Sequence, residues 1–216
     1  MTGLIMKDLL VMRKTMKSYL LIIVLYVVLA YLDVLNYGFI ITFIQVMLMV
    51  LPITAFAYDE QAKWDRYAVA LPLGRSRVVG ARYLFVLMLT VITTAMGLVG
   101  TAILTLVHEA EPLEMLLTLA VSTTIGLLVP AILLPLCYKL GAERSRPYLY
   151  AIIFIPTILV VLLAKIDVID FSALNALEDL TSAVLLGGLS LLPLGALAAL
   201  LVSYLISCRI TAGKEY

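Results

Sequence analysis

The residues best suited to specific chemistry lie in one polar segment, residues 58–82, with the sequence YDEQAKWDRYAVALPLGRSRVVGAR. This segment holds the only tryptophan of the chain, five of its fifteen Lys and Arg residues, and a Leu-Pro-Leu-Gly turn. Aromatic and Arg side chains are enriched where proteins bind one another. The segment therefore predicts a docking surface for another protein.

The sequence patterns of common catalytic sites are absent. There is no GxxxxGK[ST] to bind nucleotide phosphates and no GxSxG around a nucleophilic serine. The single histidine, His108, excludes an HExxH zinc site. The two cysteines, Cys137 and Cys208, form no CxxC pair and are expected to be free thiols. We therefore expect no catalytic residue, metal or cofactor on this chain.

The composition is that of a membrane protein. Hydrophobic residues make up 64% of the chain and charged residues 13%, whereas soluble domains carry about 25% charged residues. Crossing a bilayer as a helix takes about 20 apolar residues, and six runs meet that need. The sequence predicts an all-α integral membrane protein with one transmembrane domain over residues 1–216. Its spans are predicted at residues 18–35, 38–57, 83–107, 115–138, 148–164 and 182–206.

Charge is distributed unevenly between the two ends of these spans. All Lys and Arg residues except Lys165 fall on the side that holds the two chain ends and residues 58–82. The opposite side holds eight acidic residues: Asp33, Glu109, Glu111, Glu114, Asp167, Asp170, Glu178 and Asp179. The positive-inside rule then places both termini and residues 58–82 in the cytoplasm. Almost no ionisable residue lies within the spans, which weighs against an ion-coupled carrier and an intramembrane enzyme.

Residues 1–17 precede the first span and have two faces. An apolar stripe at helical spacing consists of Ile5, Leu9, Met12 and Met16, and the other side carries Lys7, Arg13, Lys14 and Lys17. This pattern favours an amphipathic helix that lies in the inner headgroup layer, with its basic side chains near anionic lipid. The alternative is that the helix braces an attached cytoplasmic subunit.

Prolines and small residues lie within the predicted spans. The prolines are Pro52, Pro130, Pro135, Pro156 and Pro193. Proline removes a backbone donor and kinks a helix, so these residues indicate either ordinary kinked packing or flexible points that open a cavity. The small residues Thr93, Gly97 and Thr101 predict a close approach between helices, within one chain or between two copies.

Residues 58–82 are expected to form a helix–break–helix elbow. The first part continues the second span, and residues 71–74 (LPLG) break the helix before the third span begins. The alternative is an interfacial loop that holds Trp64 and Tyr67 at headgroup depth.

The order of residues in the elbow is distinctive: Glu60…Trp64…Tyr67…Leu71-Pro72…Arg75…Val79…Arg82-Tyr83. Near the N-terminus, Lys7-Asp8-Leu9-Leu10 is followed by Lys17-Ser18-Tyr19. Together with the six spans and inward termini, these features resemble the small ABC-2 family of ABC transporter permeases. Arg82 stands where many members of that family have Lys, a departure that keeps the charge.

The resemblance implies a half-transporter of the bacterial cytoplasmic membrane. Two permease copies, or two related permeases, would bind two copies of a cytoplasmic ABC ATPase that carries ATP and Mg. In that family the connection between spans two and three holds the coupling helix, which docks on the ATPase. The resemblance assigns this role to Glu60, Lys63, Trp64, Arg66, Tyr67, Leu71, Pro72, Leu73, Arg75 and Arg77. Trp64, Tyr67, Leu71 and Leu73 would be apolar anchors within a basic rim.

The resemblance also suggests a cargo. Permeases that export phenol-soluble modulins, which are amphipathic bacterial peptides, are the nearest comparison. An amphipathic peptide or a hydrophobic drug would suit a cavity lined by apolar side chains. The favoured function is the membrane subunit of an ATP-driven exporter. The alternative is a non-transport protein, an assembly or immunity factor, that binds a cytoplasmic partner through the same segment; no nucleic acid partner is expected.

Overall fold

The computed structural model describes residues 2–32, 37–64, 67–68, 74–107, 112–165 and 182–213. Within these ranges the chain is helical and contains no strand, which confirms the all-α class. The helices are α1 (Thr2–Tyr31), α2 (Tyr37–Gln61), α4 (Arg75–Val107), α5 (Pro112–Leu140), α6 (Ala142–Lys165) and α8 (Ser182–Ala212). All except α1 contain a stretch long and apolar enough to cross a membrane. The first predicted span, residues 18–35, continues into residues 33–36, which lie outside the described ranges.

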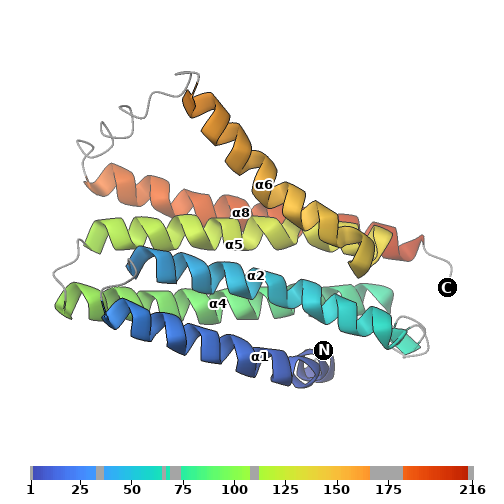
Figure 1. Ribbon diagram of the computed structural model, residues 1–216. Coiled ribbons are helices and arrows are strands. Elements are labelled where there is room, and N and C mark those ends of the chain that lie inside the picture. Colours follow the sequence, from blue (N-terminus) through green and yellow to red (C-terminus); the bar gives the residue numbers. More distant parts are fainter. Residues whose placement is uncertain are drawn as a thin grey trace.

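The helices form a bundle around α5. Figure 1 shows α1, α2, α4, α5 and α8 side by side, while α6 leans away from α8. Helix α5 packs against α2, α4, α6 and α8, and α2 and α4 also each pack against four helices in the described part of the chain. The start of α1, the end of α2, the start of α4 and the end of α8 lie at the same end of the bundle (Figure 1). We call this end the linker end.

Helix α1 differs from the predicted arrangement of residues 1–17. It continues without a break from Thr2 to Tyr31, so no helix end separates an interfacial helix from a span. The apolar stripe that contains Met12 packs against α2 and α4, in a cluster with Leu51, Ala55, Phe85 and Leu89. The apolar stripe is therefore covered by protein, and the position of the helix in the headgroup layer stays a prediction. An amphipathic pattern shows that a face must be covered, and here protein covers it.

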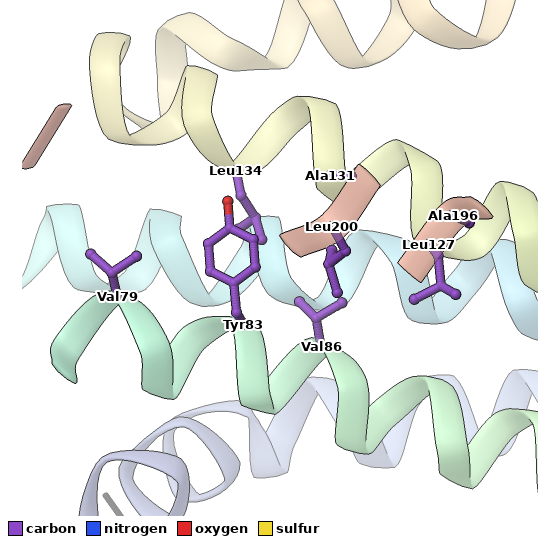
Figure 2. Close-up of a cluster of buried hydrophobic side chains, with 8 residues drawn as sticks. All are labelled: Val79, Tyr83, Val86, Leu127, Ala131, Leu134, Ala196 and Leu200. Atoms are coloured by element: carbon purple, nitrogen blue, oxygen red, sulfur yellow. The ribbon is translucent and has the colours of Figure 1, made fainter. Parts of the chain in front are cut away.

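The largest buried cluster lies where α4, α5 and α8 meet. Its members are Val79, Tyr83, Val86, Leu127, Ala131, Leu134, Ala196 and Leu200 (Figure 2). Lipid tails are as apolar as these side chains, so close van der Waals packing and hydrogen bonds between helices stabilise such a contact. Gly97 on α4 contributes in the same way, because a Cβ at that position would collide with the Leu119 side chain of α5. The small-residue stripe therefore packs within one chain at Gly97.

A hydrogen-bonded chain compensates for one of the helix prolines. Pro135 has no N–H, so the carbonyl of Ala131 loses its usual helical donor. Ser203 of α8 donates its hydroxyl to that carbonyl at 2.5 Å. The Tyr83 hydroxyl, which projects from α4 toward α5 in Figure 2, lies 2.6 Å from Ser203 Oγ and 2.7 Å from Ser207 Oγ. The backbone carbonyl that Pro135 leaves free is thus satisfied by a neighbouring helix.

We expect the substitution Ser203→Ala to destabilise the bundle by about 1 kcal/mol, because it leaves the Ala131 carbonyl without its side-chain donor. Ser207→Ala is the matched control, since the Ser207 hydroxyl pairs with Tyr83 and its loss leaves no proline-freed carbonyl without a donor. Thermal unfolding of the purified protein in detergent measures both variants. A larger loss for Ser207→Ala than for Ser203→Ala would contradict this account.

Candidate functional site

The last turn of α2 carries two adjacent carboxylates into the linker end. The helix extends past the predicted span to Gln61, and it therefore includes Asp59 and Glu60. It ends where Lys63 adopts a φ of 52°, a left-handed conformation that is typical of the residue after a helix. The amide of Lys63 donates to the carbonyl of Glu60 at 3.0 Å. The chain consequently turns away from the axis of α2 and directs Trp64 back toward the bundle.

Asp59 belongs to a group of four charged side chains from three helices, which we call the charge cluster. Its carboxylate oxygens lie 2.6 and 2.9 Å from Lys7 Nζ on α1, and it also pairs with Arg82 Nη2 on α4. Asp8 lies 3.1 Å from Lys7 Nζ and 3.0 Å from Arg82 Nη1. Each carboxylate therefore contacts both cations, and the cluster carries no net formal charge.

The charge cluster is largely removed from water. The side chain of Asp8 is 6% exposed and that of Arg82 is 7% exposed. Burying an ion costs several kcal/mol, and the pairing repays that cost only when each charge has well-placed partners. A planar guanidinium can reach two carboxylates with different nitrogens, and Arg82 also stacks over the Phe56 ring at 4.7 Å. Because its charges balance, the charge cluster can join three helices at a buried position.

Trp64 closes one side of the charge cluster. Lys7 Nζ lies 4.4 Å from the centroid of its ring, a distance typical of a cation–π contact. Trp64 also borders a cavity of about 30 Å³ together with Leu4, Val78 and Tyr138. This tryptophan is half-buried, and one face of its ring is covered by α1.

Glu60 points to a different helix from its neighbour Asp59. Its Oε2 accepts hydrogen bonds from the backbone amides of Ala142 at 2.7 Å and Glu143 at 3.4 Å. These amides belong to the first turn of α6. Asp59 and Glu60, two successive residues, thus connect the end of α2 to α1, α4 and α6.

Residues 3–212 match the family described as ABC-2 family transporter protein. The chain belongs to the ABC-2 family. No curated protein and no solved structure matches it. The ABC-2 permease is a membrane component of an ABC transporter, and membership of the family implies an ABC ATPase as its partner.

The permease holds the predicted docking residues in different ways. Lys63, Tyr67 and Arg77 are exposed, with 65% of the Tyr67 surface accessible. Trp64 and Glu60 are engaged by α1 and α6. Arg75 is the first residue of α4. Four of the predicted docking residues lie outside the described ranges: Arg66, Leu71, Pro72 and Leu73.

The sequence alone did not reveal the charge cluster. Its members were visible as exceptions to their surroundings: Asp8 is acidic within a basic segment, and Arg82 directly precedes an apolar run. These residues are far apart in the sequence, and nothing local indicates that they meet. A search for opposite charges at the same end of successive spans would have found them.

We expect Arg82→Met to destabilise the permease by about 3 kcal/mol, because Asp8 and Asp59 would then share only Lys7. Arg82→Lys keeps the charge but has a single ammonium group, so its cost should be about 1 kcal/mol. Arg77→Met is the control, since Arg77 is an exposed cation on the same helix. Unfolding midpoints in detergent rank the three variants, and a midpoint for Arg82→Met equal to that of Arg77→Met would rule out the structural role of the cluster.

Proposed function

We propose that this permease is the membrane-spanning subunit of an ATP-driven exporter and that residues 60–77 receive the movement of a separate ATPase. The observation that carries the proposal is the double link at the end of α2. Asp59 pairs with α1 and α4, and Glu60 bonds to α6. A partner that binds this segment would therefore act on four helices at once. Membership of a transporter family favours transport over an assembly or immunity factor.

The proposed partner is a cytoplasmic ABC ATPase in two copies, which would carry ATP and Mg. Tyr67 is the best described candidate for an apolar anchor, because its ring is exposed and exposed Lys63 and Arg77 flank it in the sequence. Trp64 is better suited to positioning the segment, since Lys7 covers one face of its ring. A second permease copy, or a related permease, would complete the transporter.

The proposed orientation places the linker end in the cytoplasm of a bacterial cell, with both termini on that side. The excess of Lys and Arg there supports this assignment. The start of α1, the end of α2, the start of α4 and the end of α8 lie at one end of the bundle (Figure 1), which supports an orientation with both termini inside.

The proposed cargo is an amphipathic peptide, such as a phenol-soluble modulin, or a hydrophobic drug, moved out of the cell. Polar groups in the middle of the described bundle bond to one another: the Gln45 amide donates to Thr123 Oγ1 at 2.8 Å. The exposed surfaces of α6 and α8 are rich in Leu and Ile. A pathway built from such surfaces favours cargo that does not need fixed charges for recognition.

We expect Tyr67→Ala to weaken binding of the ATPase encoded beside the permease gene by about tenfold or more, since an interface anchor typically contributes 2 kcal/mol or more. Unfolding of the free permease should not change, because Tyr67 is exposed. Trp64→Ala should instead lower the stability of the permease itself. Co-purification and titration in lipid nanodiscs measure binding, with exposed Tyr148→Ala as the control.

Two outcomes count against the proposal. Wild-type permease that binds no ATPase would remove its basis. Equal affinity of wild type and Tyr67→Ala would exclude Tyr67 as an anchor and direct attention to Leu71 and Leu73.

A further inference from the structure

The first turn of α6 takes its N-terminal cap from another helix. The first amides of a helix have no partner within the helix, and usually a side chain just before the helix accepts from them. The residue before α6 is Gly141, which has no side chain to serve. The carboxylate of Glu60 takes this place, at 2.7 Å from the amide of Ala142 and 3.4 Å from that of Glu143. Glu60 and Ala142 are separated by 82 positions in the sequence.

The connection between α5 and α6 is shaped around this carboxylate. Gly141 is its only residue, and its φ is +90°, a conformation that L side chains rarely adopt. A Cβ at Gly141 would lie 2.7 Å from Glu60 Oε1. The Gly141 amide donates to Cys137 at 2.9 Å, and its carbonyl accepts from Ser145 Oγ at 2.6 Å. Glycine is therefore needed both for the backbone turn and for the space that Glu60 occupies.

Helix α6 is otherwise weakly attached within the chain. Among the described helices it packs against α5 and α2. Every residue from 153 to 159 is exposed, and the helix leans away from the bundle in Figure 1. Its attachment is concentrated at the linker end, where the Glu60 carboxylate meets the positive end of the helix dipole. Hydrogen bonds to a charged group are about twice as strong as neutral ones.

We infer that the contact between Glu60 and the first turn of α6 couples movement of the end of α2 to α6. We call this contact the latch. That an ATPase causes this movement rests on the proposed function, whereas the coupling between Glu60 and α6 does not. Because Asp59 in the same turn joins α1 and α4, the latch adds α6 to the set of helices that move with the docking segment. Glu60 thus acts as a positioning residue at the start of the docking segment.

Hydrogen exchange tests the latch in the permease alone. Glu60→Ala should speed exchange of the Ala142 and Glu143 amides by about tenfold or more, the effect of losing charge-assisted hydrogen bonds. Glu60→Gln keeps an acceptor without the charge and should give a smaller increase. Gln61→Ala is the control, since Gln61 is exposed at the same helix end. Unchanged exchange in Glu60→Ala would overturn the latch.

Gly141→Ala provides an independent test, because the added methyl group would displace the Glu60 carboxylate. It should speed exchange in the first turn of α6 in the wild-type background. In the Glu60→Ala background the same change should have a smaller effect, because only the backbone strain at a φ of +90° remains. Equal effects in the two backgrounds would show that Gly141 acts through backbone strain alone and would contradict the proposed fit.

The complex with the ATPase tests transmission. Spin labels at exposed Val99 on α4 and Ile155 on α6, with Cys137 and Cys208 replaced by Ala, report the separation of the two helices. ATP should change this distance in wild type and leave it unchanged in Glu60→Ala, while the ATPase stays bound. An ATP-dependent change that persists in Glu60→Ala would overturn the latch. Loss of ATPase binding by the Glu60→Ala variant would also overturn it. Absence of ATPase binding by wild type would refute the proposed function and leave the exchange result standing.

Discussion

The pairing of Arg82 with Asp8 and Asp59 is the interaction on which the linker end depends. A buried guanidinium is tolerated only where carboxylates offset its desolvation, and the two that do so come from different helices, α1 and α2. One cation therefore fixes three helices at a single point. The first turns of α1 become part of the protein core, with Met12 fully buried against α2 and α4.

The two carboxylates at the end of α2 point toward different neighbours because of helix geometry. Successive residues of an α-helix are separated by about 100° around its axis, so Asp59 and Glu60 cannot face the same neighbour. Asp59 meets side-chain cations, whereas Glu60 meets backbone amides. The first contact is a network with several alternative partners, and the second is a single carboxylate on one helix end. The end of α2 is therefore attached to α1 and α4 by several ion pairs and to α6 by one carboxylate.

Local patterns predicted the helices well and the contacts between them poorly. Bilayer thickness sets the length of apolar runs, and the predicted runs lie within the observed helices α2, α5 and α8, of which α8 continues six residues past the predicted end at residue 206. The stripe of α1 was correctly seen as a covered face, but its period cannot say whether lipid or protein covers it. Trp64 was predicted to be an anchor for the ATPase because of its residue type, although Lys7 covers one face of its ring. The fit between Glu60 and Gly141 joins distant parts of the chain, and a glycine before a helix gives no sign of the carboxylate beside it.

The helices also differ in where they are attached to their neighbours. Close to the linker end, the neutral side chains Tyr83, Ser203 and Ser207 join α4, α5 and α8 through hydrogen bonds. Helix α6 has its main attachment at one end. It contains 24 residues, so it is about 36 Å long, and a tilt of about 10° at its first turn moves its far end by about 6 Å. A tilt of α6 about its first turn would therefore be amplified at the opposite end of the helix.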